Sequence, residues 1–235
     1  MTKKILRRTD TIRLGGAGVP SVLLRPDLDT RVPGVLLLHG YSSSKEVLSN
    51  TMGIALARGG IASLSIDLPL HGSRDEDMFE EARSNPLGLL KHWKRAIDEV
   101  KDAIAWLAAH SAIDPLRIGI VGYSLGSYIA LQTAAAEKSV KCVVVAAGGD
   151  LPATQWTNMV RMVTDPLASV RKSSGRPLLI LHGVNDRTIR REQAQALFDA
   201  ASEPKTVKWY QSGHVLPPAA ADDAAAWIVE QFSPA

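Results

Sequence analysis

The sequence predicts an α/β fold, a doubly wound and mostly parallel β-sheet with helices on both faces. Short apolar runs alternate with longer amphipathic segments, and no internal repeat or linker interrupts that order. Several runs are apolar at every position, which suits strands buried on both faces of a parallel sheet. At this length, residues 1–235 are expected to form one domain.

The predicted strands are short apolar runs spaced along the whole chain. The opening residues, 11–24 around GGAG, predict a hairpin that adds antiparallel strands at one edge of the sheet. The strand segments are VPSVLLRP, PGVLLLHG, IASLSIDL, RIGIVGYS, KCVVVAAG and RPLLILHG, followed by TVKWYQSG.

Helical spacing of apolar residues separates these strands. In residues 45–58 the apolar side chains make one stripe, and the glycine pair 59–60 ends the helix. Residues 87–109 form the longest predicted helix, with Asp114 and Pro115 beyond its end. The remaining helices are predicted over residues 125–138, 190–201 and 218–232.

Composition and charge exclude several classes of function. The chain has 46% apolar and 22% charged residues, which is typical of a globular protein with a sizeable core. Its net charge is +3 and its basic residues are scattered, so no nucleic acid partner is expected. The single cysteine, Cys142, lies among β-branched residues and is predicted to be a buried thiol without a disulfide.

The sequence predicts neither a secretion signal nor a membrane span. No segment approaches the ~20 uninterrupted apolar residues that a membrane helix requires, and the charged start is not followed by an apolar run. Metal-ligand spacing and phosphate-binding glycine loops are also absent from the sequence. We therefore expect a cytoplasmic protein that uses no metal and no cofactor.

Three polar residues stand just after predicted strands, where parallel sheets form their sites. Ser124 follows RIGIVGY, Asp186 follows the LHG run and His214 follows the last strand. A serine hydroxyl alone is a poor nucleophile, so it needs a base, and the base needs an orienting carboxylate. Each residue alone could simply form a turn. Together they predict a catalytic triad of Ser124, Asp186 and His214.

Two glycines flank the serine in the segment GYSLG. The serine must sit in a strained turn between a strand and a helix, where a bulky side chain at Gly122 or Gly126 would strike a neighbouring element. The start of the following helix places backbone N–H groups and a positive dipole end beside the hydroxyl.

These residues resemble the α/β-hydrolase superfamily, from about Pro33 to the carboxyl end. GYSLG is similar to that family's nucleophile elbow, and the order of Ser, Asp and His agrees with it. The segments LLLHGY, DLPLHG and LHGVND are most similar to the dienelactone-hydrolase-like and small serine carboxylesterase branches. Dienelactone hydrolases have a cysteine where this chain has Ser124, so the resemblance implies ordinary esters rather than dienelactone.

Acyl transfer also needs donors for the oxygen that becomes negative. One backbone N–H is expected from Leu125, directly after the nucleophile, and the other from Tyr41, the matching position in the loop after LLLHG. The hydroxyl of Tyr41 is an alternative donor, and a ring that only covers the site is another. By the same resemblance, Asp67 and His71 belong to a turn that braces loops beside the site, and a substrate contact by His71 is the alternative. His39 and His182 are expected to hydrogen-bond loop backbone.

Residues 149–176 are predicted to form a short cap over the site. We expect this segment to carry one helix, whose apolar face either closes a modest substrate pocket with Trp156, Met159 and Met162 or packs on the sheet. A small cap favours small or short-chain acyl groups. Arginines are expected near the same rim, as surface charges or as partners for a substrate carboxylate: Arg161, Arg187 and Arg190.

The predicted reaction is hydrolysis of a small-molecule carboxylic ester through an acyl-enzyme on Ser124. A thioesterase or a small peptidase would use the same groups. From another class, a hydrolase-like protein could bind a ligand without turnover, although it would have no need for all three triad residues. The sequence predicts no oligomeric state.

Overall fold

The computed structural model describes residues 5–14, 17–74, 80–81, 84, 88–154, 157 and 160–233. The side chains at positions 7, 9–11 and 17 lie outside this description. All structural statements below concern the described residues.

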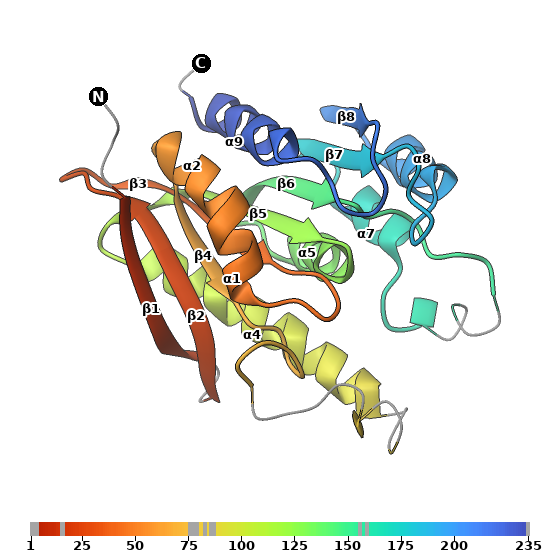
Figure 1. The fold of residues 1–235 in the computed structure, drawn as a ribbon, viewed down its shortest axis with the longest axis horizontal. Helices are drawn as coiled ribbons and strands as arrows, with labels where there is room; N and C mark the ends of the chain where they lie inside the picture. The colour runs from red at the N-terminus through yellow and green to blue at the C-terminus, as the bar shows by residue number, and fades with distance from the viewer. Residues whose placement is uncertain are drawn as a thin grey trace.

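An eight-stranded sheet forms the centre of the molecule (Figure 1), with the strand order β1-β2-β4-β3-β5-β6-β7-β8. Strands β3 to β8 pair in parallel, whereas β1 pairs antiparallel with β2, and β2 antiparallel with β4. This arrangement confirms the predicted fold class and the antiparallel amino-terminal edge. The strands are β1 (Ile5–Leu14), β2 (Ala17–Pro26), β3 (Val32–Leu38), β4 (Ala62–Ile66), β5 (Ile113–Tyr123), β6 (Val140–Ala146), β7 (Leu178–Gly183) and β8 (Lys205–Tyr210).

Helices cover both faces of the sheet, as the alternation of elements predicts. The predicted helix over residues 45–58 is divided by one π-helical segment, which the sequence pattern did not reveal. The helices are α1 (Lys45–Leu48), η1 (Ser49–Gly53), α2 (Ile54–Arg58), α4 (Gly88–Ala109), α5 (Leu125–Ala136), α7 (Pro166–Lys172), α8 (Arg191–Ala200) and α9 (Ala219–Phe232).

Alternate side chains of the central strands belong to two separate cores. In β3, Leu36 and Leu38 pack with α4 and α5, whereas Val35 and Leu37 pack with α2 and α9 on the opposite face. This alternation follows from the two-residue period of a strand. Cys142 in β6 is fully buried as predicted, and burial raises the pKa of its thiol to about 12. Among the described residues, no helix is both long and apolar enough to cross a membrane.

A buried ion pair joins the loops that follow β3 and β4. The Asp67 carboxylate is fully buried and accepts hydrogen bonds from the amide and Nζ of Lys45, each at 2.8 Å, and from the Ser73 amide at 2.8 Å. The bracing role expected of Asp67 is therefore confirmed. Lys45 is the partner of Asp67, and His71 Nδ1 lies 2.8 Å from the carbonyl oxygen of Pro69 in its own turn.

Replacing Asp67 by Asn should destabilise the fold by about 3 kcal/mol, because the ammonium of Lys45 loses its buried counter-charge. Urea unfolding measures the change. Asp29→Asn, at an exposed loop position, is the matched control and should change stability by less than about 0.5 kcal/mol. Equal stability of the two variants would show that the ion pair does not hold these loops.

Candidate active site

Backbone strain is concentrated at the carboxyl edge of the sheet. Four non-glycine residues of the described chain have positive φ: Ser42 at 53°, Leu70 at 67°, Ser124 at 48° and Ala147 at 48°. They lie in the segments that follow β3, β4, β5 and β6 respectively. Such conformations persist only where the surroundings enforce them, and they cluster at functional sites. The strain therefore marks this edge as the place to seek a site.

Ser124 stands between the end of β5 and the start of α5 in one of these turns. A Cβ at Gly122 would lie 2.3 Å from the carbonyl oxygen of Gly126, and a Cβ at Gly126 would lie 2.2 Å from that of Leu38. Neither position can hold a side chain without backbone movement. The steric reason that the sequence pattern suggests for both glycines is confirmed.

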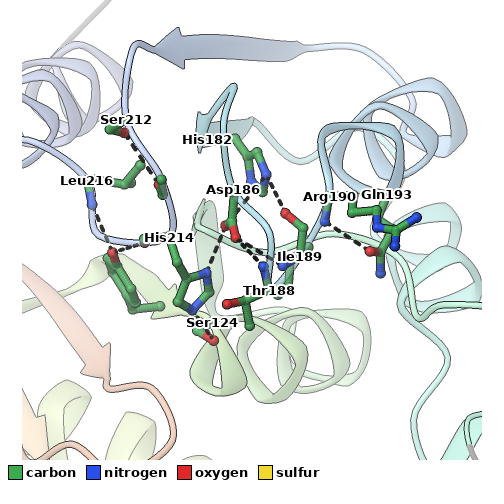
Figure 2. A network of polar contacts seen from close by, with 12 residues as sticks. Ser124, His182, Asp186, Thr188, Ile189, Arg190, Gln193, Ser212, His214 and Leu216 are labelled. Atoms are coloured by element: carbon green, nitrogen blue, oxygen red, sulfur yellow. Dashed lines mark hydrogen bonds and ion pairs between the residues drawn. The ribbon is translucent and has the colours of Figure 1, made fainter.

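The three predicted triad residues form one chain of hydrogen bonds (Figure 2). His214 Nε2 lies 2.9 Å from Ser124 Oγ, and His214 Nδ1 lies 2.7 Å from Asp186 Oδ2. The side chain of Asp186 is fully buried, whereas that of His214 is 26% exposed. A serine hydroxyl, an imidazole and a carboxylate thus lie within hydrogen-bond reach of one another, although they come from three separate loops.

The buried carboxylate of Asp186 is held by the backbone of its own loop. Its Oδ1 accepts hydrogen bonds from the amides of Thr188 at 2.8 Å and Ile189 at 3.1 Å. The carbonyl oxygen of Ile189 lies 3.0 Å from Nε2 of His182, which is fully buried. Burial lowers the pKa of His182, so this imidazole is neutral at pH 7. The prediction that His182 bonds loop backbone is confirmed.

Tyr123 fixes the loop that carries His214, a role that the sequence analysis missed. Its hydroxyl donates to the carbonyl oxygen of His214 at 2.6 Å and accepts from the amide of Leu216 at 3.1 Å. Burial raises the pKa of Tyr123, which keeps the phenol protonated and able to donate. The sequence signal that could have predicted this role is the position of Tyr123 directly before Ser124 in GYSLG.

The two predicted oxyanion donors flank the serine. Leu125 is the first residue of α5, where a backbone amide has no carbonyl partner within its own helix. Tyr41 lies in the loop after β3, and a Cβ on the preceding Gly40 would lie 3.3 Å from the Cβ of Ser124. This loop is therefore packed against Ser124. Tyr41 is 50% exposed. Its ring stands edge-on to the ring of His71, and the two ring centroids lie 5.8 Å apart.

His39 links this loop to the turn after β4. The Leu68 amide donates to His39 Nε2 at 3.1 Å, so the ring proton is on Nδ1 and is donated to the carbonyl oxygen of Gly40 at 2.8 Å. Burial, partly opposed by the hydrogen bond to Gly40, lowers the pKa of His39 to about 4. Its predicted role as a backbone brace is confirmed.

A cavity of about 720 Å³ opens beside Ser124 and His214. Its walls come from residues 47–58 of α1, η1 and α2 and from residues 214–222. None of the described residues of the expected cap, 149–176, lines it. Among the expected pocket residues, Met162 is 82% exposed, and Trp156 and Met159 lie outside the described residues.

Helix α7 of the cap segment packs on the face of the sheet that α4 and α5 cover, whereas the cavity opens on the face that α2 and α9 cover. Helix α7 lies against α5, and its Val170 is buried in the same core as α4 and α5. Arg161 donates to Asp150 Oδ2 at 2.7 Å, whereas Arg187 and Arg190 are exposed. None of these three arginines lines the cavity at Ser124. The cap and its pocket stay a prediction.

The sheet order, the strained serine turn and the Ser–His–Asp arrangement define an α/β hydrolase. A model of the alpha/beta hydrolase family matches residues 35–227, so the chain belongs to that family. Esterase YjfP of Escherichia coli is 28% identical over 198 residues, which cover 74% of this chain and 77% of that protein. Polyketide transferase ATR5 of Stachybotrys chlorohalonatus is 30% identical over 117 residues, half of this chain. This chain spans only 36% of the length of ATR5.

A solved structure supports the fold over nearly the whole chain. A cold-adapted esterase from an Arctic intertidal metagenomic library superposes with a TM-score of 0.76, covering 97% of this chain and 95% of that one. Its sequence identity is 20%, so the likeness concerns the fold alone.

Gly122→Ala should destabilise the protein by about 1–3 kcal/mol, because the added methyl group meets the backbone of α5 and cannot be accommodated by a side-chain rotation. Gly213→Ala is the control, since the nearest atom to its added methyl lies 3.9 Å away. Urea unfolding of both variants measures the difference. Wild-type stability of Gly122→Ala would contradict the steric account of the elbow.

Stability should depend on pH through His39. Its folded pKa of about 4 lies below the unfolded value of about 6.5, so the unfolded state binds more protons in that window and stability falls as pH falls. Between pH 7 and pH 5, the wild type should lose about 2 kcal/mol more than His39→Gln, which cannot titrate. Urea unfolding at both pH values tests this. Equal losses of stability in the wild type and in His39→Gln would show that His39 is not held neutral.

Proposed function

We propose that this protein is a serine hydrolase that cleaves carboxylic esters through an acyl-enzyme on Ser124. The observation that carries the proposal is the unbroken chain of hydrogen bonds from Ser124 Oγ through His214 to Asp186. The relative named an esterase supports the same class of reaction. The substrate is a small-molecule ester, and the proposed chemistry requires no metal or cofactor.

His214 is the general base in this proposal. Its Nε2 takes the proton of Ser124 as the serine oxygen attacks the ester carbonyl carbon, and the same nitrogen then protonates the leaving alcohol. Asp186 accepts from Nδ1, which holds the imidazole in the productive tautomer and stabilises its charged form. Water activated by His214 then attacks the acyl-enzyme and releases the acid.

The amides of Leu125 and Tyr41 are the proposed donors to the oxyanion. Donors that are fixed in advance toward this oxygen lower the barrier by roughly 3 to 4 kcal/mol each. Leu125 is supported by its place at the start of α5, where the helix dipole adds to the effect. Tyr41 is supported by the packing of its loop against Ser124.

A second candidate uses the same acyl-enzyme with a different substrate or acceptor. The relative named a polyketide transferase favours transfer of the acyl group to an acceptor other than water, and a thioester or amide substrate would need the same residues. A binding protein without turnover has no physical need for the Ser124–His214 bond. The short-chain preference expected from the cap stays a prediction, although the described residues that line the cavity at Ser124 come from other elements.

Ser124→Ala should lower kcat for p-nitrophenyl esters by about 10⁶-fold, because the nucleophile is removed while the rest of the site is unchanged. Ser111→Ala, on an exposed turn, is the matched control and should keep full activity. Circular dichroism verifies the fold of both, and mass spectrometry after fluorophosphonate treatment should find the adduct on Ser124. Undiminished hydrolysis by pure Ser124→Ala protein would refute the proposal.

A further inference from the structure

We infer that the cavity beside Ser124 is an aliphatic groove, which binds an unbranched apolar chain of the ester. The groove lies between α1, η1 and α2 on one side and the start of α9 on the other. Its walls include Val47, Leu48 and Met52 on the first side, and Leu216, Ala220 and Ala221 on the second. The inference rests on the proposed function, since the chain must belong to a molecule that reacts at Ser124.

The size and position of the groove fit such a ligand. Its volume of about 720 Å³ lies within the range of small-molecule sites, roughly 300–1,000 Å³. Ser124 and His214 contribute to its lining, and Arg58 and Asp222 lie among the helix residues that complete it. An ester bond placed at Ser124 therefore has continuous space for a substituent between the two helical walls.

Exposed apolar side chains surround the same cavity. Within the described part of the chain seven large apolar side chains are exposed, and three of these line this groove: Tyr41 at 50%, Val47 at 52% and Val215 at 81%. Single exposed apolar residues need no explanation, whereas a group of them around a cavity marks a ligand site. A bound alkyl chain would remove them from water.

The π-helical segment shapes one wall of the groove. Three of the five residues of η1, Asn50, Thr51 and Met52, line the cavity. On the other side of the same segment, a Cβ on Gly53 would lie 2.9 Å from Ser63 Oγ and 3.0 Å from Leu24 Cδ1, so the backbone is pressed against the sheet. A π-helical turn holds one more residue than an α-helical turn, and such turns often occur at functional sites.

The chemistry of the walls selects an aliphatic chain over a charged group. The side chains of Val47, Met52 and Leu216 offer no partner to a carboxylate or ammonium that loses its water against them, which is costly. An alkyl chain gains from the same burial. Arg58 and Asp222 are the charged residues that the helices contribute to the lining. The groove runs between the loop of Tyr41 and the loop of His214, so the chain can belong to the acyl or to the alcohol part of the ester. An alkyl chain from the acyl part and one from the alcohol part of the ester have the same apolar chemistry.

Two substrate series distinguish these sources. One varies the acyl chain in p-nitrophenyl esters from acetate to decanoate, and the other varies the alcohol in acetate esters from ethyl to octyl. In the series that enters the groove, kcat/KM should rise about fourfold per added methylene until the groove is filled. A flat or falling profile in both series, with Ser124 labelled by fluorophosphonate, would overturn the inference and leave the proposed function intact.

A blocking variant assigns the chain to this groove. Val47→Trp introduces bulk at a half-exposed position that tolerates it, and should reduce the octanoate-to-acetate ratio of kcat/KM, or its alcohol counterpart, at least tenfold. Ala221→Trp fills the opposite wall and should do the same. Ala226→Trp, on the exposed face of α9 outside the groove, is the matched control and should keep the wild-type ratio.

The outcomes of these measurements are separable. If both blocking variants remain labelled by fluorophosphonate and keep the wild-type ratio, the chain binds elsewhere and the inference is wrong. If wild-type Ser124 is not labelled and no ester is turned over, the proposed function fails first, and the groove inference fails with it.

Discussion

The left-handed backbone of Ser124 is the constraint on which the site depends. Its φ of 48° costs energy for any residue with a side chain, and the turn persists because several contacts enforce it. The Ser124 amide donates to the carbonyl oxygen of Ala146 in β6, and Ser127 Oγ donates back to the carbonyl oxygen of Ser124. With the close approach at Gly122 and Gly126, these bonds attach the serine rigidly to the end of a central strand. A base can be effective only if it finds that oxygen at a fixed position.

Around this rigid point, neutral buried groups hold the loops that surround Ser124. Each of three loops around Ser124 is held by a hydrogen bond from a buried group. His182 holds the loop of Asp186, Tyr123 holds the loop of His214, and His39 holds the loop of Gly40. Burial shifts the pKa of each group so that it stays neutral. Desolvation outweighs the hydrogen bonds in each case, so these groups do not exchange protons near pH 7. Asp186 therefore retains its backbone donors on one oxygen, and its other oxygen is available to His214.

The sequence predicted where the strands end, but it did not predict the contacts between loops that follow different strands. Apolar runs and helical stripes predicted the sheet, its amino-terminal hairpin and the positions of Ser124, Asp186 and His214, because strand-end chemistry depends on local order along the chain. The role of Lys45 was not predictable, since a lysine at the start of an amphipathic helix is normally exposed and only the fold brings it to Asp67. The helical spacing of apolar residues predicts that Val47 is buried with the rest of the stripe in residues 45–58. In the structure Val47 is 52% exposed and lines the cavity. The π-helical segment shifts the helical register after residue 48, and no periodicity analysis detects one inserted residue.

In the function that we propose, the placement of the groove separates selection of the substrate from the positioning of Ser124. On one face of the sheet α4 and α5 pack closely against the strands, and on the other the layer formed by α1, η1, α2 and α9 leaves the cavity open at the carboxyl edge. Ser124 is fixed by β5, β6 and α5, none of which includes Val47, Met52 or Ala221. A change in a groove side chain can therefore alter which chain fits while the strained turn and its hydrogen bonds remain as they are. Because Tyr41 and His214 line the groove together with Ser124, the chain that we propose to bind there has its ester at Ser124.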